Sequence, residues 1–379
     1  MSPRIAVLGA GAMGASVAKL LARHEDVEIL VLDMDAERAE SAAAAAGPGR
    51  AEARSFDAEA GELPRVLRGA GAVAVCLPYR LNLTAMRAAL DAGVPYADLG
   101  GLFHMTRRQL ELDGVFRAAG TPALIGIGAC PGLSNVMARL ASHRLDAVES
   151  IDIVDGSVDP ALSGFAVPYS AETILDELDL PAMVFESREL REVPAGSGAV
   201  DYEFPEPVGR MEAVYTLHSE LATLPSTIPG VRDVRWRLAL PPAVMGAYRV
   251  LVELGLSSRD PVELPAGPVV PRDLLLALLK RLPAPSGPPV DVEFLDVSAT
   301  GTLDGHPAAF LGRSRFDPQP EGIGGGPFGT SAPIAVAARW LAAGRVPPGV
   351  HAPEDALDPE PFLEDLALEG VAFEVLVEA

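Results

Sequence analysis

The chain has 379 residues and is 49% hydrophobic, so it is long enough for two domains and too apolar for a disordered protein. Its formal net charge of -22 at pH 7 argues against nucleic acid or an anionic membrane as a partner. The two cysteines, Cys76 and Cys130, each lie in an apolar stretch, so we expect reduced thiols in a cytoplasmic protein. We also expect no signal peptide and no membrane span, because the chain opens on a strand pattern and no apolar run approaches roughly 20 residues.

A glycine-rich turn lies close to the start of the chain, in the sequence RIAVLGAGAMG over residues 4–14. Gly9, Gly11 and Gly14 have the G-x-G-x-x-G spacing between a strand pattern and a helix pattern. In a dinucleotide-binding fold these glycines allow, in turn, a tight turn, the approach of a pyrophosphate, and close packing of helix on strand. The next strand pattern ends in Asp33, about 20 residues after the turn, where an acid binds the ribose hydroxyls. A glycine-rich turn of some other α/β protein is the alternative, and it would not need this acid.

Patterns typical of strands and helices alternate up to residue 127. The strand patterns cover residues 5–8, 27–32, 51–56, 72–77, 96–98 and 123–127, with helix patterns over residues 13–21, 37–46, 63–67, 84–92 and 107–119. This order predicts an α/β Rossmann domain, with a doubly wound parallel sheet, over residues 1–128. Ligands of such sheets bind at the carboxyl ends of the strands. The residues expected at this edge are Asp57, Leu77, Pro78, Tyr79 and Asp98.

The pattern changes after about residue 149. Short strand patterns separated by Pro and Gly cover residues 151–153, 186–193, 200–204, 213–217, 231–240, 290–300 and 306–315, and helix patterns cover residues 170–178, 243–254 and 273–282. This order predicts a second α+β domain with a mostly antiparallel sheet, over residues 129–328. The sequence GIGGGPFGTSAP, over residues 322–333, is interpreted as a glycine-rich loop leading into a helix that ends at Gly344. A further helix and a closing strand are expected at 362–368 and 371–377.

Several motifs together resemble the saccharopine dehydrogenase-like family, and within it the bacterial lysine 6-dehydrogenases. They are LPY (77–79), YADLGG (96–101), ACPGLSN (129–135), YTLHSELATLP (215–225) and the tail GTSAPIAVAARWLAAGRVPPGVHAPE. The resemblance covers nearly the whole length. It implies a central domain that often makes a dimer contact, a C-terminal segment over 329–379 that returns to the first domain, and NAD(P)-dependent oxidation at a C–N bond of an amino acid. Saccharopine-forming members tend to have an acid before the Pro-Gly and a histidine further on; Cys130 and Asn135 stand there instead, which favours a lysine-type substrate.

Three residues are candidates for the catalytic chemistry. Asp98 ends a strand where a nicotinamide should lie, so its carboxylate could hold the substrate ammonium or take its proton; the alternative is a turn or cap residue. Tyr79 could line the nicotinamide pocket or bind a substrate carboxylate, or could be a wall residue with a satisfied hydroxyl. His218 lies near Glu220 and could form a proton relay or a substrate clamp, although a solvent-facing histidine in a sheet is the commoner case.

Three further residues are candidates for binding substrate. Ser134 and Asn135 stand where a helix starts after a Pro-Gly pair, which suits a carboxylate, and plain capping is the alternative. Arg249 could neutralise an α-carboxylate through its planar fork, or form an ordinary surface salt bridge. The coenzyme candidates are Gly9, Gly11, Ala12, Met13, Gly14, Asp33, Asp57, Leu77 and Pro78. Asp33 predicts NAD over NADP, with NADP possible because Arg38 lies near, and no residue cluster has the spacing of zinc ligands.

Four functions remain open on the sequence alone. The first is an NAD-dependent dehydrogenase that oxidises the 6-amino group of L-lysine to the semialdehyde and releases ammonia, acting as a homodimer. The second is a saccharopine dehydrogenase or a carboxynorspermidine-type polyamine dehydrogenase. The third is a dinucleotide-sensing regulator without chemistry, which the candidate side chains and the large second domain argue against. The fourth, a sugar oxidoreductase with the same N-terminal fold, would carry Glu-Lys-Pro after the fifth strand, where this chain has YADLGG.

Overall fold

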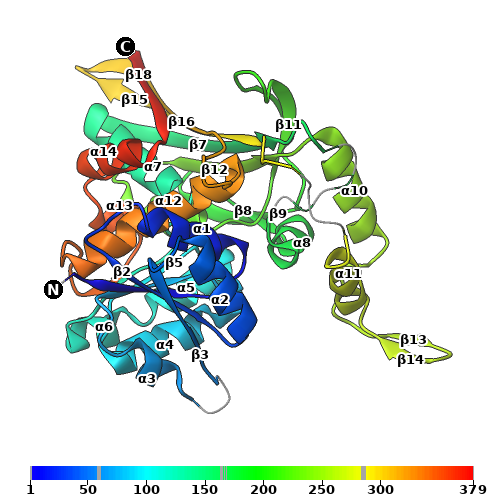
Figure 1. Cartoon of the computed structure of the whole chain (residues 1–379). Coiled ribbons are helices and arrows are strands. Elements are labelled where there is room, and N and C mark those ends of the chain that lie inside the picture. Colours follow the sequence, from blue (N-terminus) through cyan, green and yellow to red (C-terminus); the bar gives the residue numbers. More distant parts are fainter. Residues whose placement is uncertain are drawn as a thin grey trace.

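The computed structural model describes residues 2–57, 61–162, 165, 167, 169–282 and 287–378, and Figure 1 shows two sheets with helices around them. Within the described residues, no helix is both long enough and apolar enough to cross a bilayer. The division into segments 1–128, 129–328 and 329–379 stays a prediction, and the two sheets are described in turn.

The first sheet is parallel throughout, and its strands in the described chain follow the order β17-β6-β5-β4-β1-β2-β3. The strands are β1 (Arg4–Leu8), β2 (Glu28–Asp33), β3 (Ala51–Ser55), β4 (Ala72–Val75), β5 (Tyr96–Asp98), β6 (Pro122–Leu124) and β17 (Gly349–His351). The central strands are apolar and buried on both faces, as expected of a sheet covered by helices on both sides. The predicted doubly wound α/β Rossmann fold is confirmed.

The helices of this half are mostly where the sequence predicts them. They are α1 (Ala12–Leu21), α2 (Ala36–Ala45), α3 (Leu63–Leu67), η1 (Tyr79–Leu81), α4 (Asn82–Ala92), α5 (Leu102–Leu110) and α6 (Asp113–Ala119). The single helix predicted over 107–119 is wrong, because two helices meet there. The first begins earlier, directly after Gly101, and the chain turns at Leu112, whose N–H is bonded to the Gln109 carbonyl.

The second sheet is mixed and mostly antiparallel, as predicted. Among the described residues its main path is β10-β11-β12-β7-β15-β16-β18, and a hairpin of β8 and β9 branches from β12. The strands are β7 (Ala147–Val158), β8 (Ala182–Glu186), β9 (Glu189–Val193), β10 (Val200–Glu203), β11 (Arg210–Tyr215), β12 (Asp233–Ala239), β15 (Val292–Leu303), β16 (His306–Phe316) and β18 (Ala372–Glu378). The strand predicted over 186–193 covers the end of β8, the turn at Ser187 and Arg188 with φ of 53° and 68°, and β9.

The remaining elements surround this sheet or project from it. They are α7 (Leu133–Arg144), α8 (Ala171–Asp179), η2 (Glu220–Ala222), α9 (Leu224–Thr227), α10 (Pro242–Glu253), β13 (Val262–Leu264), β14 (Gly267–Val269), α11 (Pro271–Leu279), α12 (Gly325–Ala342), α13 (Pro353–Ala356) and α14 (Pro359–Glu369). The segment from α10 to α11, which we name the arm (residues 242–282), extends to the right of the body in Figure 1.

The C-terminal region connects the two halves. Helix α12 packs along α1 and against β4, and β17 pairs with β6 at the edge of the parallel sheet. The last strand, β18, pairs instead with β16 of the second sheet. The glycine-rich stretch is helical from Gly325 onward, where a loop was expected. A Cβ on Gly325 would lie 2.5 Å from the backbone oxygens of Asp291 and Phe316, so the glycine permits close packing rather than flexibility.

Candidate functional site

The glycine-rich turn forms a cradle between β1 and α1. Gly9 has φ of +101°, and a Cβ on Gly14 would lie 1.8 Å from the Gly9 oxygen, so both positions require glycine. A Cβ on Gly11 would have nothing within 4 Å, which leaves the backbone open to a pyrophosphate. The N–H groups of Ala12 and Met13 stand in the first turn of α1, before the helical hydrogen bonds begin, and can face a phosphate.

Asp33 closes this cradle at the end of β2. Its Oδ2 accepts a hydrogen bond of 2.7 Å from the Ala10 N–H, and its Oδ1 accepts one of 2.9 Å from the Asp35 N–H. The acid is therefore held beside the glycine turn, where the fingerprint needs it. The side chain of Leu77 lies against Gly9, its Cδ2 3.0 Å from an added Cβ. Asp57 follows β3, and its N–H donates to the Glu62 carboxylate at 3.0 Å.

Asp98 ends β5 but is fully buried within a ring of donors. Its carboxylate accepts hydrogen bonds from the Tyr96 hydroxyl at 2.7 Å and the Gln109 amide at 2.5 Å. It also accepts from the N–H groups of Gly100 and Gly126, at 2.9 and 2.8 Å. Burial raises the pKa of Asp98, and these hydrogen bonds oppose the rise. The carboxylate joins two loops at the edge of the sheet, and this geometry favours the turn-residue alternative, while a catalytic role of Asp98 stays a prediction.

His218 lies in the loop between β11 and η2 and is buried. Its Nδ1 is hydrogen-bonded to the Glu220 carboxylate, and its Nε2 lies 4.0 Å from Oε1 of Glu177 on α8. Its ring stacks on the indole of Trp236. The carboxylates of Glu220, Glu177 and Asp155 raise the pKa of His218 against the effect of burial, which lowers it. The prediction of a His–Glu pair therefore agrees with the geometry.

Further carboxylates around His218 were not predicted. Burial raises the pKa of Glu177 to about 7, and the Tyr169 hydroxyl donates to this carboxylate. Burial likewise raises the pKa of Asp155, on β7, to about 7, with His218 opposing the rise. Cys130 Sγ lies 3.9 Å from Asp155 Oδ2, and burial keeps this thiol protonated by raising its pKa. We name His218, Glu220, Glu177 and Asp155 the acidic histidine cluster.

Of the two predicted substrate residues on α7, Ser134 contacts this cluster and Asn135 is bonded to other groups. The Ser134 hydroxyl donates to Glu220 at 2.7 Å. Asn135 accepts from the Gly132 N–H at 3.0 Å and donates to Glu354 at 2.9 Å, so its amide is used within the protein. Neither side chain offers the free helix terminus that was expected for a carboxylate, because both groups are buried and paired.

Two other candidates are paired with acidic side chains of the protein. Arg249 is on the surface of the arm, where its Nη2 forms an ion pair of 2.8 Å with Glu212, which is the salt-bridge alternative. Tyr79 lies in η1 at the carboxyl edge of the parallel sheet, as predicted, but its hydroxyl donates to Asp176 of α8 at 2.7 Å. Among the residues that the structure describes, no group of three His, Cys, Asp or Glu side chains could hold a metal ion.

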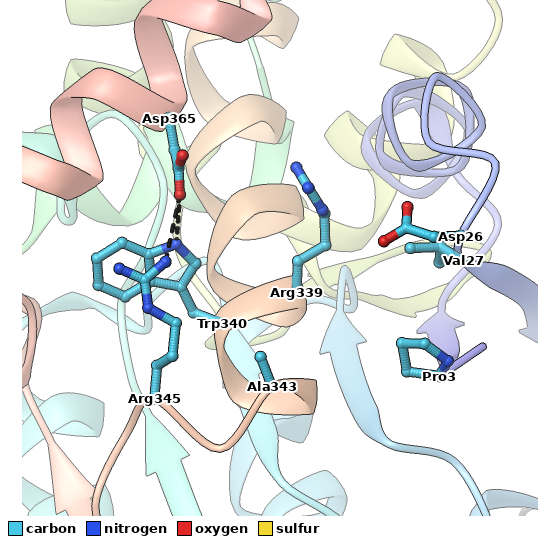
Figure 2. A pocket seen from close by; sticks show the side chains of 8 residues that line it. All are labelled: Pro3, Asp26, Val27, Arg339, Trp340, Ala343, Arg345 and Asp365. Atoms are coloured by element: carbon cyan, nitrogen blue, oxygen red, sulfur yellow. Dashed lines mark hydrogen bonds and ion pairs between the residues drawn. The ribbon is translucent and has the colours of Figure 1, made fainter. Parts of the chain in front are cut away.

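A separate cavity of about 180 Å³ lies beside the C-terminal end of α12, and Figure 2 shows its lining residues. Its lining residues are Pro3, Asp26, Val27, Arg339, Trp340, Ala343, Arg345 and Asp365. Pro3 and Val27 precede β1 and β2, so the cavity lies at the amino ends of these strands, opposite the glycine cradle.

Two family models cover almost the whole chain. The saccharopine dehydrogenase NADP binding domain matches residues 5–124, and the saccharopine dehydrogenase C-terminal domain matches residues 128–371. Together with the glycine cradle they define an NAD(P)-dependent oxidoreductase, which is the predicted enzyme class. The chain belongs to the saccharopine dehydrogenase-like family, as its motifs predicted.

Curated relatives are similar over most of the chain. Carboxyaminopropylagmatine dehydrogenase from Synechocystis sp. is 27% identical over 73% of this chain and 72% of its own length. Carboxynorspermidine synthase from Vibrio cholerae is 26% identical over 79% of this chain and 76% of its own length.

Solved structures share the fold at low identity. Saccharopine dehydrogenase from Saccharomyces cerevisiae superposes with a TM-score of 0.78 at 17% identity, covering 100% of both chains. Homospermidine synthase from Legionella pneumophila, in complex with NAD, superposes with a TM-score of 0.67 at 12% identity, covering 100% of this chain and 92% of the other. These likenesses establish the fold of both domains.

Proposed function

We propose that this enzyme oxidises, or forms by the reverse reduction, a C–N bond in a polyamine-like or amino-acid substrate that carries more than one ammonium group. The acidic histidine cluster is the observation that carries this proposal. Its three acids surround one imidazole, and Glu177 and Asp155, whose pKa values are about 7, gain negative charge as the pH rises through neutral, so the site can attract cations. NAD(P) bound in the glycine cradle would exchange a hydride with the carbon that carries the nitrogen.

His218 is the group that we propose to move the proton. An aliphatic amine has a pKa of about 10.4 and is protonated at neutral pH, so its nitrogen must lose a proton before hydride can leave. The Glu220 carboxylate holds Nδ1 of His218, which leaves Nε2 for the substrate. Glu177 lies 4.0 Å from Nε2 and could hold the substrate ammonium beside it. Asp98 is less suited to be the base, because both of its carboxylate oxygens accept hydrogen bonds from the protein.

The relatives favour the polyamine alternative over the lysine hypothesis. The curated relatives bear names of carboxylated polyamine enzymes, and the acidic histidine cluster suits a substrate with several ammonium groups. L-lysine remains the second candidate, because Cys130 and Asn135 replace the acid and the histidine expected of saccharopine-forming members.

A coenzyme-coupled screen tests both candidates. We would follow absorbance at the reduced-coenzyme band with NAD and NADP separately, using carboxynorspermidine, carboxyaminopropylagmatine, saccharopine, homospermidine and L-lysine. The expected result is turnover of a carboxylated polyamine at a higher kcat/KM than L-lysine. Turnover of L-lysine alone would return the sequence-based hypothesis to first place. Tight NAD(P) binding without turnover of any amine would favour the dinucleotide-sensing regulator.

We also propose that the enzyme is a cytoplasmic homodimer, with the arm against the second copy. The arm exposes the apolar side chains of Val250, Leu254, Val262, Leu264, Leu274, Leu278 and Leu282. It carries five basic and four acidic residues, so it can approach the acidic body of another copy without repulsion. Light scattering should give a dimer that Leu278→Glu dissociates and that Leu368→Glu, on α14, leaves intact. A monomeric wild-type protein would exclude the dimer.

A further inference from the structure

The coenzyme edge of the parallel sheet contacts one helix of the second domain through two adjacent side chains. Tyr79 and Arg80 lie in η1, the element that follows β4 in the chain. The Tyr79 hydroxyl donates to Asp176 at 2.7 Å, and the Arg80 guanidinium forms an ion pair with Glu172. The two acids are one helical turn apart on α8 and so present the same face to η1.

The contact with Asp176 is buried and fully paired. Asp176 is 4% exposed, and its other oxygen is 2.8 Å from Nη1 of Arg272 on α11. Burial and the neighbouring Asp176 raise the pKa of Tyr79, so its hydroxyl keeps its proton and remains a donor. Removing a hydrogen-bond donor from a buried carboxylate destabilises the folded protein, because the oxygen is left without a partner. This bond therefore resists displacement of η1 from α8.

The residue after Asp176 lies on an adjacent face of α8. Glu177 carries the carboxylate that lies 4.0 Å from Nε2 of His218, about 100° further round the helix. Its carbonyl also accepts from the N–H of Leu217 at 3.4 Å, next to His218. One face of α8 is thus bonded to the coenzyme edge and an adjacent face to the loop that carries the histidine.

We propose that Tyr79 is a positioning residue: through Asp176 it holds α8 so that Glu177 stays in place beside His218 and the coenzyme edge. This inference rests on the proposed function, because it assumes that Glu177 and His218 act on the substrate amine. Tyr79 itself needs no contact with substrate. We therefore expect that removing its hydroxyl lowers turnover only because Glu177 is displaced.

The test is a double-mutant cycle between Tyr79→Phe and Glu177→Gln. We expect Tyr79→Phe to lower kcat about 10-fold, the loss of one well-placed hydrogen bond, while the KM for coenzyme changes less than about 2-fold. In the Glu177→Gln background the same change should lower kcat less than about 2-fold, because the group it positions is already absent. Equal losses in both backgrounds, or a rise confined to the coenzyme KM, would overturn the proposal and make Tyr79 a wall of the nicotinamide pocket.

Tyr202→Phe is the matched control. The Tyr202 hydroxyl also donates at 2.7 Å to a buried aspartate, Asp296, which is paired with Arg313. Asp296 is opposite Val154 in the sheet register, so it faces away from Asp155, and the control should keep kcat within about 2-fold of wild type.

Hydrogen exchange gives a readout that does not need a known substrate. Tyr79→Phe should speed the exchange of the amides of α8 by about 10-fold, and Tyr202→Phe should not. Unchanged exchange in α8 would contradict the positioning role even where the proposed function holds. Faster exchange in α8 with no amine turned over by wild type would leave the contact intact and reject the proposed function instead.

Discussion

The imidazole of His218 lies nearly parallel to the indole of Trp236, with ring centroids 3.9 Å apart and 17° between the planes. The indole is itself fixed, because its Nε1 donates to the Thr216 hydroxyl at 2.9 Å. With Nδ1 bonded to Glu220, the ring has one orientation, and Nε2 points toward Glu177. These contacts hold the ring in place, so the proton transfer that we propose for His218 would take place at Nε2.

His218→Asn should therefore lower kcat by about 100-fold or more, the usual scale for loss of general acid–base help. Coenzyme affinity, measured by calorimetry, should stay within about 3-fold, because the cradle is formed by other elements. His104→Asn is the control: His104 is an exposed histidine on α5 and should have no effect. A His218→Asn variant with normal turnover would remove the acidic histidine cluster from the mechanism.

Asp98→Asn should act on stability rather than on chemistry. The side-chain amide has one acceptor oxygen, so it cannot accept all the hydrogen bonds that the carboxylate receives from Tyr96, Gln109 and the two glycine N–H groups. The expected loss is about 1–3 kcal/mol in the free energy of unfolding, measured in urea. Turnover per folded molecule should stay within a few-fold of wild type. A 100-fold loss of kcat at unchanged stability would restore the sequence-based hypothesis that Asp98 is the base.

The sequence predicted the Rossmann fold well because local signals specify it. The glycine spacing, the apolar strands and Asp33 all lie within the first 33 residues, and the structure joins them as expected. The ends of strands were also predictable. The contacts of a side chain at a strand end were not predictable, because Asp98 and Asp33 each follow an apolar strand and look alike in sequence. Asp98 is buried by Tyr96 and Gln109, whereas Asp33 remains at the cradle.

The site in the second domain depends on contacts between distant segments. Glu220 was visible beside His218 in the sequence, and the resemblance supported the pair. Glu177 and Asp155 come from α8 and β7, and no local pattern separates them from the many other acids of a chain with a net charge of -22. Arg249 shows the converse: an arginine on a helix most often pairs on the surface, as it does here with Glu212.

Asp33 should determine the choice between NAD and NADP. Its carboxylate can accept from both ribose hydroxyls of NAD but would repel a 2′-phosphate. Asp33→Asn keeps an oxygen for the Ala10 N–H and removes the charge, so the ratio of NADP to NAD affinity should rise about 10-fold. Asp26→Asn, an exposed acid before the same strand, should leave the ratio unchanged. An unchanged ratio for Asp33→Asn in calorimetry would show that another residue discriminates.

The buried carboxylate of Glu177 should destabilise the folded protein when it is ionised. Burial raises its pKa from 4.5 to about 7, so the folded protein binds a proton more tightly than the unfolded chain between these values. This contribution to stability is present at low pH and is lost as the pH rises through about 7. Glu177→Gln should thus raise the thermal midpoint relative to wild type more at pH 8 than at pH 5. If the difference in thermal midpoint between the two proteins does not vary with pH, the pKa of Glu177 is not raised in the folded protein.

The pH dependence of turnover should reverse between the two directions of the reaction. Oxidation of an amine needs His218 unprotonated, and its pKa is raised mainly by Glu220 and Glu177 against burial, so the oxidative rate should rise as the pH passes above neutral. Reduction needs the proton that His218 holds below that pKa, so the reductive rate should fall over the same range. Glu177→Gln removes one of the charges that stabilise the imidazolium, so both limbs should move to lower pH. Glu189→Gln, an exposed acid on β9, should move neither limb. Limbs that stay in place in Glu177→Gln would mean that a group other than His218 carries the proton.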